Sequence, residues 1–214
     1  MTDPRSGTLN GAPIDQQIDN GKRTWIIAST CAGVVGTGAA AIPFVASFQP
    51  SERARAAGAA VEVDIGAIKP GEKLTVEWRG KPVWIIRRTP EQLAELPKVD
   101  AELADPKSLR KPDELTPEYA RNEFRARSDH KELLVVVGIC THLGCSPSDK
   151  FVPGPQASLP DDWKGGFLCP CHGSTFDMAG RVFKDKPAPD NLEIPPHMYL
   201  GDTKIFIGED KKGA

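Results

Sequence analysis

The sequence reads CTHLGC at residues 140–145 and CPCHGS at residues 169–174, and these two short boxes decide how the chain is interpreted. Each box holds two cysteines and one histidine, and each follows a short apolar run that is typical of a β-strand. We therefore expect each box to form a loop at the end of a strand. Thiol and imidazole groups gathered in two such loops are soft or borderline ligands, so the boxes predict a metal site.

Zinc is the first alternative for this site. Structural zinc modules usually take their ligands from a Cys-x2-4-Cys pair and a His-x3-5-His pair. Here each box would give one cysteine and one histidine and leave a cysteine pair over, which disfavours zinc. A double disulfide without metal would leave both box histidines without a role. The other histidines, His130 and His197, have no partner cysteines and are expected to be surface or loop residues.

Short apolar runs bounded by proline and glycine extend from residue 61 almost to the C-terminus and predict an antiparallel sheet domain. A charged stretch with several prolines, 88–128, interrupts these runs. We expect it to be a surface excursion with one or two short helices that serves only as solvated covering. The head, residues 61–214, should therefore be mainly β. The apolar runs cover residues 61–65, 74–78, 82–87, 133–140, 166–169 and 204–208.

A stretch without charged residues, 24–48, follows a polar N-terminal tail at 1–23. At about 1.5 Å per residue, a helix of this length crosses a hydrocarbon core of about 30 Å. This predicts an uncleaved transmembrane anchor, in contact with lipid. A cleaved signal peptide usually has an apolar part of only about 7 to 15 residues, and a core helix would show a polar face. The segment 49–60 is expected to be a flexible tether.

Charge gives two further indications. The formal net charge is -2, and no block of basic residues interrupts the chain, so we exclude nucleic acid as a partner. Lys22 and Arg23 before the apolar stretch are similar to a twin-arginine export signal with lysine in place of the first arginine. Positive charge at this end predicts a cytoplasmic N-terminal tail, although Arg53 and Arg55 beyond the stretch weaken that argument.

The two boxes together resemble those of the Rieske proteins of cytochrome bc complexes. The likeness extends to the single N-terminal anchor, the short tether and the β-rich head. The resemblance implies an antiparallel Rieske-type β-sandwich with a cluster-binding subdomain at about 138–192. It also implies one 2Fe-2S cluster for each chain.

The resemblance assigns the ligands by position. Cys140 and Cys169 would bind one iron through sulfur, and His142 and His172 would bind the other through nitrogen. Two neutral imidazoles in place of two thiolates leave the oxidised cluster without net charge. An electron then enters more readily than in a cluster held by four thiolates.

The resemblance also pairs Cys145 with Cys171 in a disulfide that joins the two boxes. Disulfides persist in oxidising compartments and are rare in cytosol. The head would therefore lie outside the cytoplasmic membrane, in the periplasm of a bacterium. The pair also separates this chain from Rieske oxygenases.

The family assigns roles to residues beside the ligands. His172 and Leu143 would contact the quinol. The hydroxyl of Ser174 would bond a cluster sulfide, and Phe176 takes the place of a frequent tyrosine, which should lower the midpoint potential. The residues expected to tune the cluster are Gly144, Gly173, Ser174 and Phe176.

Two further segments near the boxes are expected to be a cover for the site and a surface loop. Pro187, Ala188 and Pro189 belong to a proline-rich stretch that resembles the loop covering the cluster in the family. Its fixed φ angles would make it a low-entropy cover against water. The spacing between the boxes is longer than in many relatives, so 146–164 is expected to be an extra surface loop.

The resemblance implies the redox subunit of a membrane quinol-cytochrome c reductase. The chain would take an electron, with a proton, from quinol at a cytochrome b subunit and pass it to a c-type cytochrome, within a dimeric complex. By itself the chain would be only an electron carrier. One alternative is the small Rieske subunit of another periplasmic oxidoreductase such as arsenite oxidase. A metal-stabilised binding module without redox activity is the other.

Overall fold

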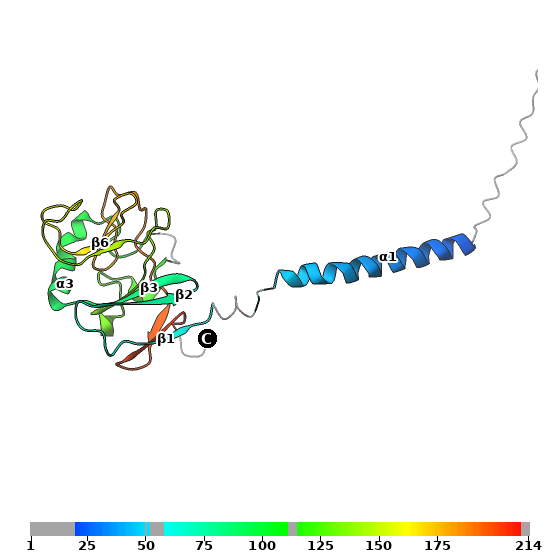
Figure 1. The fold of residues 1–214 in the computed structure, drawn as a ribbon, viewed down its shortest axis with the longest axis horizontal. Helices are drawn as coiled ribbons and strands as arrows, with labels where there is room; N and C mark the ends of the chain where they lie inside the picture. Colours follow the sequence, from blue (N-terminus) through cyan, green and yellow to red (C-terminus); the bar gives the residue numbers. More distant parts are fainter. Residues whose placement is uncertain (1–19, 50, 52–57, 111–114, 211–214) are drawn as a thin grey trace, which may run out of the picture. The chain divides into compact units, whose positions relative to one another are not determined.

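The computed structural model describes residues 20–49, 51, 58–110 and 115–210 and divides the chain into two units. Met1–Ser51 contains the N-terminal helix, and Glu52–Ala214 contains the sheets (Figure 1). Most of the predicted N-terminal tail and of the predicted tether lies outside the described residues. We describe the two units separately.

Helix α1, Asn20–Ser47, has 28 residues. It is about 42 Å long at 1.5 Å per residue, which exceeds a hydrocarbon core of about 30 Å. Its mean hydropathy reaches 1.6, and it is long and apolar enough to cross a membrane. Thr24 and Thr30 donate their hydroxyls to carbonyls four residues back, both at 2.8 Å, so these polar groups are satisfied within the helix. The helix begins before the charge-free stretch and continues through Pro43.

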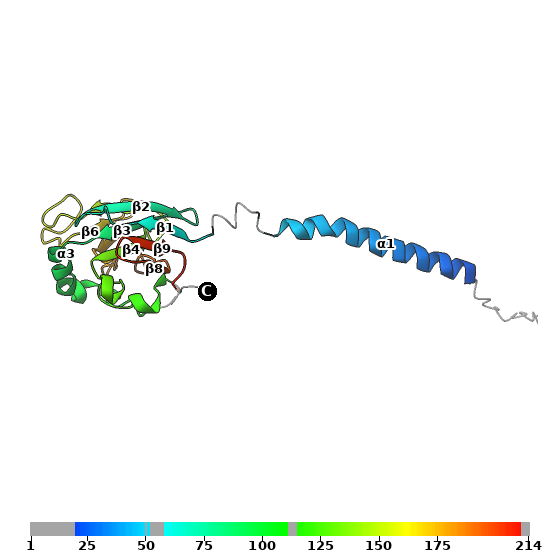
Figure 2. The same cartoon turned by 90° about the horizontal axis from the view of Figure 1, so that it is seen from below.

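The described part of the head forms three sheets of three strands, and every pairing is antiparallel. The prediction of a mainly β, antiparallel head is confirmed. Figures 1 and 2 place β6 at the end of the head opposite to β1. The sheets, in spatial order, are β1 (Val61–Asp64), β9 (Lys204–Ile207) and β8 (His197–Tyr199); β2 (Lys73–Trp78), β3 (Lys81–Arg87) and β4 (Leu133–Val137); and β5 (Ser148–Lys150), β6 (Gly166–Leu168) and β7 (Thr175–Asp177).

Strands β3 and β4 are buried on both faces. Side chains alternate between the two faces of a strand, and here alternate residues enter different cores. Val83 and Val135 pack against β1 and β9, whereas Trp84 and Val136 pack against the sheet that carries the second box. Because both faces of the strand are buried, the run 133–137 before the first box is apolar at every position and shows no alternation of apolar and polar residues.

Aromatic rings join the middle sheet to the box-bearing sheet. Trp84 on β3 stacks on Phe167 of β6 with centroids 5.2 Å apart, and Phe151 meets the same Phe167 ring edge-on at 5.5 Å. Lys73 lies 4.5 Å over the Trp84 ring and pairs with Asp149 of β5 at 2.6 Å. Ring packing and one ion pair thus fix the box-bearing sheet against β2 and β3.

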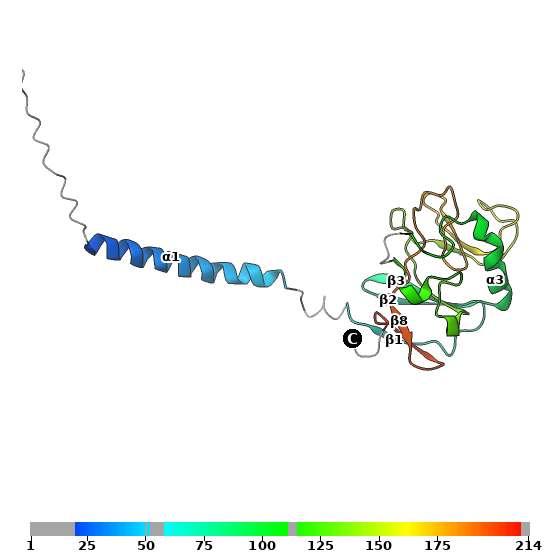
Figure 3. The same ribbon diagram turned by 180° about the vertical axis from the view of Figure 1, so that it is seen from behind.

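The excursion 88–128 is not a solvated covering, and that prediction is wrong. Leu96, Val99 and Leu103 are buried, because the short helices pack against the box-bearing sheet. A capping box of Thr89 and Gln92 begins the first helix. Figure 3 shows these segments from behind. The helices are α3 (Pro90–Glu95) and three 3-10 turns, η1 (Leu96–Glu102), η3 (Glu118–Ala120) and η4 (Ser128–His130).

Three fully buried arginines hold the excursion in place. Arg88 donates to Phe124 O at 2.8 Å and to Lys131 O. Arg125 donates to Ala179 O at 3.1 Å and to Leu192 O at 2.6 Å. Burial lowers the pKa of Arg125 to about 9 and of Arg88 to about 10, so both remain charged at neutral pH.

The third arginine, Arg181, follows the turn 177–180 that ends β7. It pairs with Asp177 at 2.7 Å and with Asp100 of the excursion at 2.7 Å, and it donates to Leu96 O at 2.8 Å. The turn that ends β7 is therefore bonded directly to η1. A buried charge is tolerated only when its hydrogen bonds are made, so these contacts fix the excursion against β7.

His197 is buried on β8, and the prediction that it is a surface or loop residue is wrong. Its Nδ1 lies 2.9 Å from Pro195 O, and its backbone N–H donates to the Tyr119 hydroxyl at 2.9 Å. Its Nε2 is buried without a hydrogen-bond partner in the described part of the chain. Burial lowers the pKa of His197 to about 4.

We predict that Gly138→Ala destabilises the head by about 1 to 3 kcal/mol. A Cβ at this position would lie 2.2 Å from the Trp84 indole, so the ring would have to leave its place on Phe167. Urea unfolding of the full chain in detergent measures the loss. Adding Trp84→Phe makes room, so the double variant should lose less than the sum of the single changes. Wild-type stability in Gly138→Ala would contradict this account.

We predict that stability falls as the pH decreases from 7.5 to 5, and that His197 contributes about 2 kcal/mol of the fall. The pKa of His197 is lower in the folded state, so the unfolded state binds more protons between pH 6.5 and 4. Protonation would also leave a buried N–H without a partner. Comparing the unfolding of wild type and His197→Gln at both pH values measures this term. An equal fall in both proteins would refute it.

Candidate metal centre

Both boxes form the same kind of loop. In each, the N–H of the first cysteine donates to the carbonyl five residues later, Cys140 to Cys145 at 2.7 Å and Cys169 to Ser174 at 2.8 Å. The glycine of each box, at positions 144 and 173, has a φ near +80°, at +82° and +73°, and donates its N–H back to that first cysteine. Only glycine takes this left-handed conformation readily, so its place in the box is a backbone requirement.

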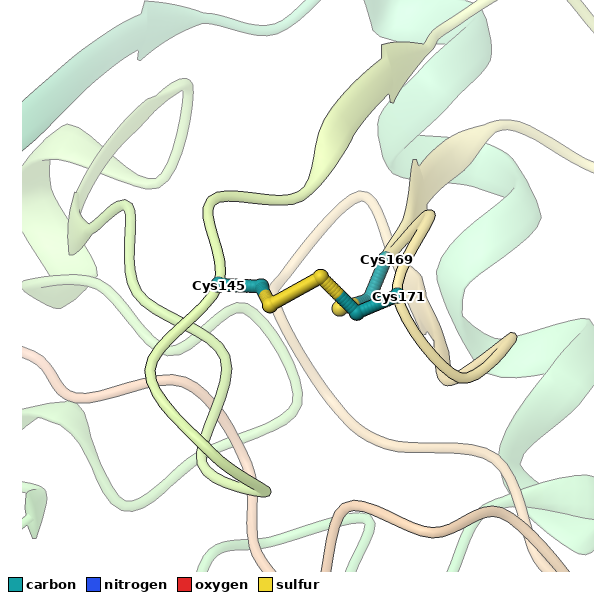
Figure 4. Close-up of side chains that lie close together, drawn as sticks. All are labelled: Cys145, Cys169 and Cys171. Atoms are coloured by element: carbon teal, nitrogen blue, oxygen red, sulfur yellow. A yellow bond between two sulfur atoms is a disulfide. The ribbon is translucent and has the colours of Figure 1, made fainter.

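The two loops are joined by a disulfide between Cys145 and Cys171, with Cα atoms 6.6 Å apart. Figure 4 shows the bond crossing from one loop to the other, with Cys169 beside Cys171. The predicted pairing is confirmed. The bond therefore holds the two loops together.

Two cysteines of the boxes keep free thiols, Cys140 and Cys169, and both are buried. The pKa of Cys140 is raised, first by burial and then by the neighbouring Cys169, while the backbone N–H of His142 and the Ser174 hydroxyl lower it. The Cys169 sulfur also lies within 4.8 Å of both disulfide sulfurs. Sulfurs in a disulfide are not thiolates, so this trio is not itself a ligand set, whereas the two free thiols can bind metal.

The two box histidines lie next to each other. Their ring centroids are 4.7 Å apart, with the ring planes at 84°. Nδ1 of His142 is buried and has no hydrogen-bond partner among the described residues. A buried ring nitrogen without a partner costs free energy, which a metal ion would recover. His172 is exposed.

The predicted proline-rich cover lies against both boxes. The N–H of Ala188 donates to the Ser174 hydroxyl at 3.0 Å, and the Thr141 hydroxyl donates to Asp190 O at 2.6 Å. Ala188 is buried, while Pro187 and Pro189 are exposed. The segment is therefore fastened to each box by one hydrogen bond.

The remaining predicted residues divide into exposed and buried ones. Leu143 is 71% exposed at the tip of the first loop. Phe176 on β7 is fully buried, in the same core as Cys140 and Cys169. The structure thus pairs the Cys140 thiol with Cys169 and the His142 ring with His172. Their assignment as iron ligands stays a prediction.

Sequence reasoning missed the residues that support the cover. Arg110 donates to Pro189 O at 3.0 Å, and Asn191 donates to Asp105 O and to Ser108 Oγ, both at 2.9 Å. These partners are about 80 positions apart in the chain. No local pattern signals such pairs.

Two protein families match the chain. The Rieske 2Fe-2S domain matches residues 104–196, and the family described as the "Ubiquitinol-cytochrome C reductase Fe-S subunit TAT signal" matches residues 25–51. The second match begins after Lys22 and Arg23 and covers most of helix α1. It fits a membrane-anchored subunit, and the first match identifies the cofactor as a 2Fe-2S cluster.

Relatives agree with both matches. The ubiquinol-cytochrome c reductase iron-sulfur subunit of Allochromatium vinosum is 55% identical over 193 residues, which are 90% of each chain. That of Bradyrhizobium diazoefficiens is 42% identical over 183 residues, 85% of this chain and 90% of the relative. A solved chain described as hyperthermophilic respiratory Complex III is 28% identical, with a TM-score of 0.42, over 83% of this chain and 97% of that one. On the sequence identities, the chain belongs to the Rieske iron-sulfur subunits of ubiquinol-cytochrome c reductase.

Proposed function

We propose that Cys140 and Cys169 bind one iron of the 2Fe-2S cluster and that His142 and His172 bind the other. The two free thiols are buried at the bases of the loops, and the two imidazoles lie next to each other. The observation that carries the assignment is the buried Nδ1 of His142, which has no partner in the described part of the chain. The remaining two cysteines of the boxes are used by the disulfide.

Bound there, the cluster supplies a one-electron centre whose potential is raised by its two neutral imidazole ligands. The chain's own residues decide what the centre reacts with. His172 is exposed, so the ring nitrogen that is not used for iron can hold a proton and meet a donor. A metal-bound imidazole becomes more basic when the metal is reduced. His172 can therefore receive a proton as an electron arrives.

Such a site suits a hydroquinone, which releases electrons and protons together. Leu143 is exposed beside the box histidines and gives an apolar surface for a quinol ring. The Ser174 hydroxyl accepts a hydrogen bond from Ala188 and bonds to the Cys140 thiol, so its proton lies within reach of sulfur at the proposed cluster site. We infer that His172 and Leu143 contact the quinol and that Ser174 raises the potential.

The disulfide supports a head outside the cytoplasm. Such a bond is sustained in an oxidising compartment, which for a bacterial membrane protein is the periplasm. Helix α1 would anchor the chain in the inner membrane with its N-terminus in the cytoplasm. The head would then take electrons from quinol at a cytochrome b subunit and deliver them to a c-type cytochrome.

The ligand assignment predicts about two irons and two acid-labile sulfides in each purified full chain. Reduction with ascorbate should give the electron paramagnetic resonance spectrum of a Rieske cluster. Cys140→Ser and His142→Ala should each abolish this spectrum, because each removes a ligand. Cys31→Ser is the matched control and should leave it unchanged, since Cys31 lies on α1. Zinc in elemental analysis, or a spectrum that survives His142→Ala, would overturn the assignment.

We predict that Phe176→Tyr raises the midpoint potential. The ring at this position lies in the core that holds Cys140 and Cys169, so an added hydroxyl can donate toward a cysteine sulfur. Such a hydrogen bond stabilises the reduced, more negative state. Redox titration followed by circular dichroism measures the shift. Phe183→Tyr, on a half-buried ring outside β7, is the control. A potential that stays the same or falls in Phe176→Tyr would contradict this reasoning.

A further inference from the structure

A groove of about 610 Å³ lies between α3 and the loop 151–164 that leads into β6. Its volume falls within the range of about 300 to 1,000 Å³ that is usual for ligand sites. The boxes do not contribute to its lining. The groove is therefore not used in the proposed electron transfer.

Both walls of the groove are fixed by internal contacts. In the loop, Gly154 N–H donates to Trp163 O at 2.8 Å, and the Trp163 indole N–H donates to Lys150 O at 2.8 Å. Phe151 packs edge-on against Phe167. On the other wall, the capping box of Thr89 holds the first turn of α3. The groove is thus formed before anything enters it.

The chemistry of the groove combines an apolar floor with an acidic rim. Phe151 and Trp163 provide the apolar floor, and Val152, which is 71% exposed, adds an apolar side chain to the rim. The charged lining residues are four carboxylates, from Glu91, Glu95, Asp161 and Asp162, against one ammonium, from Lys164. Glu95 is already paired with Lys98 at 2.6 Å, so the other three carboxylates carry the unbalanced negative charge of the rim. Carboxylates next to aromatic rings favour a cation that carries an apolar neighbour.

We propose that this groove docks a basic segment of a protein partner, in which a lysine or arginine lies beside an apolar side chain. The apolar side chain would fill the floor against Phe151, and the cation would meet the carboxylates. Asp161, Asp162 and Val152 are exposed on the rim, so the complementary surface continues outside the cavity. A polypeptide covers such a surface, whereas a small ligand is largely enclosed by its pocket.

The proposal can be tested by placing a photoreactive benzophenone amino acid at position 152 of the full chain, in place of Val152. The experiment uses membranes of the cells that produce the protein. Irradiation should give an adduct whose mapped peptide, from another protein, holds a lysine or arginine next to an apolar residue. The same label in place of Leu200, an exposed apolar residue outside the groove, should not give this adduct.

Charge dependence provides the second measurement. Combining Glu91→Gln, Asp161→Asn and Asp162→Asn should lower the adduct yield by about tenfold, as expected when several exposed charge pairs are lost. The matched control neutralises Glu77 and Asp202, which are exposed outside the groove, and should keep the yield. The electron paramagnetic resonance spectrum of the cluster should be unchanged in all these variants, which shows that the head is intact.

Three results would overturn the proposal. The first is no adduct although mass spectrometry shows the label in place. The second is an adduct only with lipid, with this chain itself or with a segment that has no basic residue. The third is a yield that the three neutralising substitutions do not change.

Discussion

Strands β3 and β4 can be buried on both faces only because the residues from Val83 to Ile86 and from Leu133 to Val137 are all apolar. A slip of one residue would exchange the side chains of the two cores, so the register of this sheet is strongly specified. The first box begins three residues after the end of β4. The second follows β6, whose Phe167 stacks on Trp84 of the same sheet. Both boxes therefore take their positions from one sheet, and the disulfide joins loops that are already placed.

Charge inside the head is arranged around the turn that ends β7. Arg125 and Arg88 bond mainly to carbonyl oxygens, and Asp177 is the buried carboxylate that contributes most to their electrostatic stabilisation. Removing one guanidinium would leave several carbonyls without donors, which costs more than a surface ion pair contributes. The excursion is thus part of the core that supports the box-bearing sheet.

The sequence predicts those parts whose signal is local. The boxes, the apolar strands and the apolar helix are contiguous patterns, and the pairing of Cys145 with Cys171 followed from a family resemblance. The burial of Arg125 could not be predicted, because a charged residue among prolines is typical of a solvated loop. Its partners at 179 and 192 lie more than 50 positions away. His197 was misjudged for the same reason, since Tyr119 is 78 positions away. The groove depends on the packing of α3 against a distant loop.

The fastening of the proline-rich cover has a consequence for how the site can be loaded. Its hydrogen bonds to neighbours include those of Ala188 with Ser174, Asp190 with Thr141 and Pro189 with Arg110, and the adjacent Asn191 adds two more, to Asp105 and Ser108. Each contributes about 1 kcal/mol net, so lifting the cover costs far less than unfolding the sheets beneath it. With this segment over the proposed cluster site, we infer that a local opening of it would control metal insertion and loss. The rate at which cofactor is lost would follow the strength of these few local hydrogen bonds, whatever the global stability of the head.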